Sequence, residues 1–205
     1  MASYSSIKYD MAIPNASTSA QVGAGAMKLI KSIDASSDST ISFVDGTSSV
    51  VLDNTYKTYI FVLTNIHPSA SNEWFKIYFS IDTGSNYTAT KVSTLFYARH
   101  FQDDSETALS YDTAGDVVGT GGDPLSDTGT DNDQGISGKI WLFNPSQTTY
   151  VKHYSGTVIS DRHNDAANTN YIGGYVNSTS AVDAVQFKFD SGNIDTGNFK
   201  LYGIA

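Results

Sequence analysis

The chain has 205 residues, of which 40% are hydrophobic and 12% aromatic, enough for one sizeable folded core. Charged residues make up only 16% and cysteine is absent, which excludes disulfides, cysteine–zinc sites and a thiol nucleophile. The net charge is −9 and no basic face is visible to neutralise phosphates, so we expect no nucleic-acid partner. No apolar run reaches the roughly 18 residues of a membrane span, and residues 1–30 lack the apolar core of a signal peptide.

Residues 1–26 are small, polar and mostly aperiodic. Larger side chains recur among them at spacings of two and three, at Tyr4, Ile7, Tyr9, Met11 and Ile13. One interpretation is a disordered tail. The other is an extended arm that becomes ordered on a neighbouring subunit, as in strand addition, and these five residues are then the interaction residues.

From residue 27 to 205 the sequence predicts a single all-β domain. Runs rich in β-branched and aromatic residues alternate with turn residues, and no stretch of eleven or more residues shows helical apolar spacing. We count about eight to ten strands and expect a two-sheet antiparallel β-sandwich of the jelly-roll kind. The expected strands are 29–33, 40–44, 58–66, 74–81, 94–101, 139–144, 149–159, 171–176, 184–190 and 199–204, with a short strand end at 50–52.

The last two runs show the clearest alternation. Val185, Phe187 and Phe189 point one way, and Phe199 and Leu201 form the apolar face of the final run. Turn residues fill the segment between them, at 191–198. We therefore expect a terminal β-hairpin that closes the core.

The acidic stretch 102–138 is expected to be a long loop, because it exceeds an ordinary connection. It carries nine acids and no lysine or arginine, whereas the rest of the chain balances twelve acids with twelve bases. Its densest set, Asp127, Asp131 and Asp133, is a candidate calcium site, although the EF-hand pattern fails. The alternatives are a solvated acidic loop and a loop that meets a basic partner. No other cofactor is indicated.

Two further sets of residues carry candidate chemistry. His163, in the polar segment 161–165, could serve a metal or act as a general base, but a plain loop tip explains the segment as well. Trp74 and Trp141 could stack on a sugar ring, but apolar neighbours favour core packing for both. The thirteen tyrosines suggest an interface, without indicating which of them are exposed.

Several short stretches resemble a family of small structural proteins of tailed phages, especially marine and cyanobacterial ones. The ending carries the likeness most clearly, at residues 191–194 and 199–204. Further matching stretches lie at 5–9, 42–46, 65–70 and 141–146. The resemblance implies a virion component that is made in the host cytoplasm, without indicating its place in the virion.

We therefore expect a non-enzymatic phage structural protein. One placement is a capsid decoration or cement subunit that binds the outer shell through its arm and a sandwich face. The other is a tail-fibre or tail-tip module that binds a glycan or protein on the host surface. Partners would be other virion proteins and further copies of this chain, with a trimer suggested by analogy alone. An enzyme such as a glycan depolymerase is the third alternative.

Overall fold

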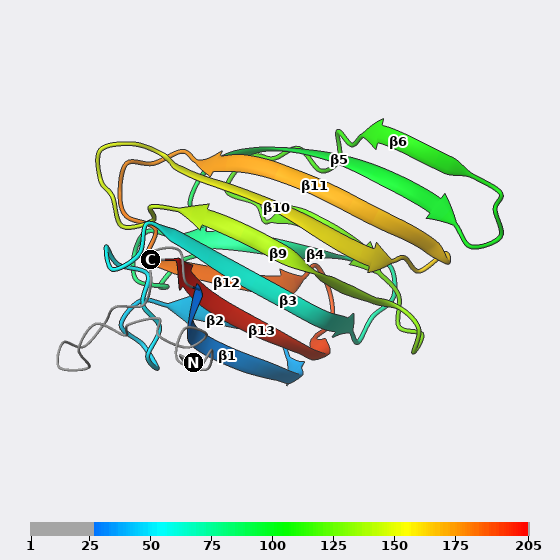
Figure 1. Ribbon diagram of the computed structural model, residues 1–205, viewed down its shortest axis with the longest axis horizontal. Coiled ribbons are helices and arrows are strands. Elements are labelled where there is room, and N and C mark those ends of the chain that lie inside the picture. The colour runs from blue at the N-terminus through cyan, green and yellow to red at the C-terminus, as the bar shows by residue number, and fades with distance from the viewer. Residues whose placement is uncertain (1–26, 205) are drawn as a thin grey trace, which may run out of the picture.

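The computed structural model describes residues 27–204, which form thirteen β-strands arranged in two antiparallel sheets (Figure 1). The strands are β1 (Met27–Asp38), β2 (Ile41–Val44), β3 (Thr58–Pro68), β4 (Glu73–Ser80), β5 (Lys91–Phe101), β6 (Thr107–Tyr111), β7 (Val118–Gly119), β8 (Asp123–Thr128), β9 (Gly135–Phe143), β10 (Lys152–Asp161), β11 (Ala166–Val176), β12 (Ala184–Phe189) and β13 (Ile194–Ile204). Within this range the predicted all-β sandwich is confirmed, and no helix is long and apolar enough to cross a membrane.

Eight of the strands have the order of a jelly roll. One sheet contains β1-β13-β3-β9 and the other contains β2-β12-β4-β8. Along these eight strands the chain changes sheet at every step except from β4 to β8, which pair side by side. This is the double Greek key of jelly rolls, in which the first and last strands are neighbours and close the sandwich.

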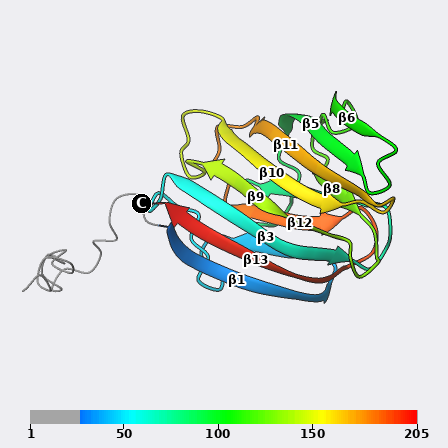
Figure 2. The same ribbon diagram turned by 45° about the vertical axis from the view of Figure 1, so that its right-hand side comes forward.

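The remaining strands extend one of the two sheets. Strands β10, β11, β5 and β6 continue outward from β9, and β7 pairs with β5, which makes a nine-stranded sheet. In Figure 2 these strands lie side by side in one curved layer, with β8 and β12 behind it. The two insertions responsible lie between β4 and β8 and between β9 and β12, so the jelly-roll order itself is undisturbed.

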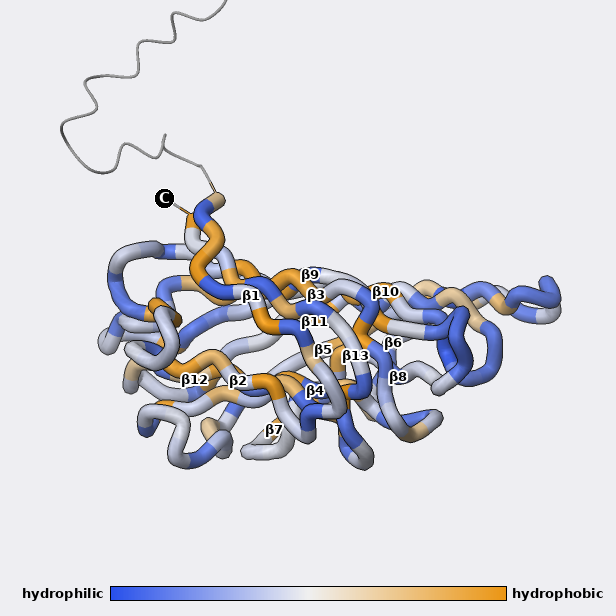
Figure 3. The backbone as a smooth tube through the Cα atoms, turned by 90° about the horizontal axis from the view of Figure 1, so that it is seen from below, coloured by the Kyte–Doolittle hydropathy of each residue, from blue (hydrophilic) through white to orange (hydrophobic). Residues whose placement is uncertain are grey.

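The core lies between the sheets and is rich in aromatic rings. Phe187 of β12 is at its centre, with the rings of Phe43, Phe61, Phe75 and Phe199 at centroid distances of 5.5 to 6.5 Å. All five side chains are almost fully buried, and they come from both sheets. Figure 3 shows the two layers from below, with hydrophobic residues concentrated in the strands of both and a hydrophilic β5–β6 connection projecting to one side.

The expected terminal hairpin does not form. Strand β12 pairs with β2 and β4, whereas β13 pairs with β1 and β3 in the other sheet. Alternation predicted correctly which side chains enter the core, but it does not select a pairing partner. The two strands bury their apolar faces against each other from opposite sheets, with 5.6 Å between the ring centroids of Phe187 and Phe199.

The stretch 102–138, expected as a loop, instead contains β6, β7, β8 and the beginning of β9. These three additional strands account for thirteen strands in place of eight to ten, and residues 50–52 form none. Five of the nine carboxylates in this stretch have side-chain partners. The pairs are Asp104 with His100, Glu106 with Arg99, Asp116 with Tyr111, Asp123 with Ser93 and Tyr154, and Asp127 with Arg162.

Candidate functional site

A row of aromatic side chains crosses the sheet extension, the strands β10, β11, β5 and β6. The row lies on the outer face, which points away from the four-stranded sheet. Tyr111, Phe96 and Tyr171 are direct cross-strand neighbours on β6, β5 and β11, and Thr157 of β10 continues the row. The rings of Phe96 and Tyr171 are parallel to within 10°, with centroids 4.8 Å apart. Phe96 is 44% exposed and Tyr171 is 41% exposed, so solvent reaches a rigid stacked pair.

A second cross-strand row runs beside the first and contains small residues. Thr94, Gly173, Ser155 and Trp141 are successive neighbours on β5, β11, β10 and β9. The small side chains leave a hollow of about 300 Å³ between the stacked pair and Trp141. We call this hollow the aromatic groove; it is lined by Phe96, Trp141, Ser155, Gly156, Thr157, Tyr171 and Ile172.

Trp141 lies on the outer face and not in the core where the sequence placed it. Its direct neighbour on β3 is Ile60, which is 2% exposed although it does not belong to the core between the two sheets. Tyr202 flanks Ile60 on the other side, so outer-face side chains bury it. Trp74, the other tryptophan, is half-buried and lines a small pocket with Tyr97, Asp127 and Arg162.

A patch of apolar side chains lies at the end of the sheet where the described chain begins. Met27 and Leu29 on edge strand β1 are 52% and 49% exposed. In register with them, Ile204 and Tyr202 lie on β13. The exposed Phe143 of β9 lies across Thr58 of β3 from Ile204. We call these five residues the β1 patch; it directly adjoins the connection to residues 1–26.

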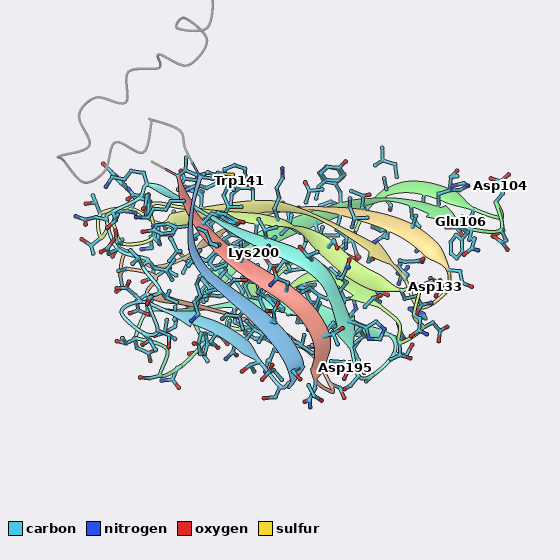
Figure 4. The ribbon with its side chains drawn as sticks, turned by 60° about the horizontal axis from the view of Figure 1, so that its bottom comes forward. Asp104, Glu106, Asp133, Trp141, Asp195 and Lys200 are labelled. Atoms are coloured by element: carbon cyan, nitrogen blue, oxygen red, sulfur yellow. The ribbon has the colours of Figure 1, made fainter. Side chains whose placement is uncertain are left out.

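The opposite end of the sandwich carries an acidic cleft of about 570 Å³. His67, Asp133, Asp161 and Asp195 are among its lining residues, and Figure 4 shows Asp133 and Asp195 at this end, away from Trp141. Burial raises the pKa of Asp161 above its ordinary value, and the neighbouring charges of Asp133 and Asp165 add to this effect. The cleft would therefore favour cationic over anionic groups.

Asp127 is paired with an arginine and does not gather with Asp131 and Asp133, the other two members of the predicted calcium set. Arg162 Nε donates to both carboxylate oxygens of Asp127, at 2.8 and 2.9 Å, and His163 Nδ1 lies 3.3 Å from Oδ2. Within residues 27–204 no three carboxylate, imidazole or thiol side chains gather as metal ligands. Asp131 and Asp133 lie in the exposed turn before β9, and their binding of calcium stays a prediction.

A buried polar network lies between the sheets. Asp123, fully buried on β8, accepts hydrogen bonds from Ser93 Oγ at 2.7 Å and Tyr154 Oη at 2.6 Å. Burial raises the pKa of Asp123 to about 6, and burial also lowers the pKa of the nearby Lys91 to about 8. Both shifts oppose the charged form, so this network links the stability of the fold to pH.

Sequence reasoning missed Phe96, Tyr111 and Tyr171 as individual residues. A usable signal was the alternation in the strand that contains Phe96, where Leu95 and Tyr97 supply the inward face and Phe96 occupies a solvent-side position. The predicted interaction residues Tyr4, Ile7, Tyr9, Met11 and Ile13 lie outside the described residues.

No family model, no curated protein and no solved structure matches this chain.

Proposed function

We propose that this protein is a non-enzymatic structural subunit of a phage virion, and that it decorates the capsid. The observation that carries the proposal is the strand order β1-β13-β3-β9 over β2-β12-β4-β8, because the jelly roll recurs in viral capsid domains. Fold alone does not determine function, so the resemblance of residues 191–194 and 199–204 to phage structural proteins is the second support.

The β1 patch is the proposed contact with the shell, together with residues 1–26. Large apolar side chains on a sheet edge favour association, because burying them removes apolar area from water. Met27 and Leu29 provide such area immediately next to residues 1–26, so one partner surface can engage both. The partners are capsid subunits, and further copies of this chain, as a trimer, are part of the proposal.

A tail-fibre or tail-tip module that binds a host receptor is the second candidate. The specific observation in its favour is the aromatic groove, because all of its lining residues except Trp141 lie on β5, β10 and β11, which extend the jelly roll. The two candidates place the protein at different sites on the virion, so its location distinguishes them.

Particle incorporation tests the attachment proposal. We compare the full chain, a chain that lacks residues 1–26 and the double variant Leu29→Ser/Phe143→Ser, each added to particles that lack the protein. Both altered chains are expected to stay folded and to sediment without the particles. Ile159→Ser is the control, because Ile159 is 54% exposed on the same sheet but lies outside the β1 patch. Normal incorporation of both altered chains would rule out this attachment surface.

A further inference from the structure

The stacked pair Phe96–Tyr171 offers one free aromatic face to the groove. A parallel partner covers only one face of each ring, so the second face of Tyr171 is turned away from Phe96. The next residue of the row on that side is Thr157, which lines the aromatic groove. The face of an aromatic ring is negative and attracts weakly positive C–H groups. The apolar face of a pyranose ring consists of such groups.

Hydroxyl groups stand beside this ring face. Ser155 and Thr157 lie two residues apart on β10 and both line the groove. Neither hydroxyl forms a hydrogen bond to another of the residues 27–204. Each can therefore donate to and accept from a ligand hydroxyl without first breaking a bond within the described protein.

Beside the hollow, β11 carries glycine where β10 carries serine. Gly173 is the direct neighbour of Ser155, and a Cβ at Gly173 would meet nothing within 4 Å. The space above the sheet is thus open between the stacked pair and Trp141. Its volume of about 300 Å³ is at the lower end of the range for small-molecule sites, which suits one or two sugar rings.

The groove is also built on rigid elements. Strands β10, β11 and β5 pair without a register shift over their whole shared length. Side chains on such strands keep their spacing, so little conformational entropy is lost when a ligand binds.

A polypeptide fits this groove less well than a sugar. Both β10 and β11 already pair with strands on each side, so a peptide cannot add as a strand there. A protein partner would need to bury about 800 Å² per side, whereas this hollow is small and has hydroxyls on its floor. An aromatic wall beside hydroxyl groups matches the two kinds of surface on a pyranose ring.

We propose that the aromatic groove is a saccharide-binding site, in which Tyr171 and Trp141 flank a sugar ring and Ser155 and Thr157 hydrogen-bond its hydroxyls. The inference deepens the receptor-binding candidate, yet it does not depend on where in the virion the protein lies. The stacked pair lies on β11 and β5, two and three strands away from Phe143 of the β1 patch on β9.

The test uses the full-length chain and five defined oligosaccharides: hexamers of α-1,4-glucose, β-1,4-glucose, β-1,4-mannose, β-1,4-N-acetylglucosamine and mannuronate. Affinity is measured by isothermal titration. Fluorescence in the variant Trp74→Phe gives a second readout, because Trp141 is then the only tryptophan. We expect at least one hexamer to bind with a Kd below about 1 mM and to change the emission of Trp141.

Matched variants separate the groove from the rest of the face. Tyr171→Ala is expected to weaken binding at least roughly tenfold, and Thr157→Val, which replaces the hydroxyl by a methyl group, to weaken it several-fold. Ile159→Ala and Tyr150→Ala alter exposed side chains outside the groove and should bind as the unchanged chain does. Melting curves confirm that each variant is folded. The inference is overturned if no hexamer binds, or if Tyr171→Ala binds normally.

Particle incorporation is measured separately on the same variants. A Tyr171→Ala chain that joins particles but no longer binds sugar confirms the groove and leaves the attachment proposal intact. A Tyr171→Ala chain that binds sugar normally but does not join particles would instead contradict the groove and assign Tyr171 to attachment. The two proposals can therefore fail independently.

Discussion

Phe96 and Tyr171 face each other across β5 and β11, with parallel rings on the solvent side of the sheet. Proteins usually place such a pair in the core, where its apolar area leaves water. Here the pair belongs to strands that extend a complete jelly roll, so packing of the core does not require it. We propose that this surface pair serves a ligand.

The first prediction is that Tyr171→Ala changes stability little. The ring is 41% exposed, so its removal forfeits part of one stacking contact and leaves no sealed cavity. We expect the free energy of unfolding to fall by about 1 kcal/mol or less, as measured by urea denaturation. A loss above about 3 kcal/mol would show instead that the ring supports the fold.

The second prediction contrasts two adjacent glycines on β11. A Cβ at Gly174 would lie 2.7 Å from Tyr154 Cζ and from the carbonyl oxygen of Val92, whereas a Cβ at Gly173 meets open space. Gly174→Ala should therefore destabilise by about 1–3 kcal/mol, because backbone cannot move aside easily. Gly173→Ala should stay within about 0.5 kcal/mol of the unchanged chain. Equal effects in thermal melting would contradict the register of β10, β11 and β5.

The third prediction concerns the pair Arg162–Asp127. Asp127 is 2% exposed, so Arg162→Ala leaves a buried carboxylate whose remaining neighbour is His163. We expect a loss of about 2–4 kcal/mol in the free energy of unfolding. Lys76→Ala is the control, because its pair with Asp190 is half-exposed and should contribute no more than about 1 kcal/mol. If both variants lose the same small amount, Asp127 is not held as described.

The fourth prediction is a pH dependence that originates at Asp123. Its folded pKa of about 6 exceeds the value of about 3.9 for an unfolded aspartate, so the folded state binds this proton more tightly. The contribution of Asp123 to stability is therefore greatest below about pH 4 and falls as pH rises through 6.

Comparison with Asp123→Asn isolates this effect, because asparagine does not titrate. Between pH 4 and 7 the unchanged chain should lose up to about 3 kcal/mol relative to the variant, measured by chemical denaturation at each pH. A constant difference across this range would mean that Asp123 does not carry a raised pKa.

Much of the fold could be predicted from local pattern, and the failures have a common cause. Alternation identified the inward residues Phe187 and Phe199 correctly, because burial on one face has a period of two. It could not show that their strands belong to different sheets, since pairing depends on residues far away in the sequence. The predicted hairpin failed for that reason.

The prediction that residues 102–138 form a loop was wrong for the same reason, because it lacked the contacts with residues far away in the sequence. Strand β8 is buried at every residue although it contains Asp123 and Asp127. Its polarity suggested an exposed loop, but Tyr154 and Arg162, more than thirty residues along the chain, satisfy these two carboxylates. The candidate site was partly predictable: Trp141 was recognised as a possible sugar contact, while its exposure on the outer face depends on the pairing of β9 with β3 and β10.

The most direct test of the central claim is to locate the protein on intact phage virions by electron microscopy, with a gold-labelled antibody against residues 27–204. We expect gold on the particles, scattered over the head for a decoration subunit. Gold confined to the tail would keep the protein in the virion and favour the receptor-binding candidate. Particles without label, alongside the protein in the surrounding lysate, would contradict the claim that it is a virion component.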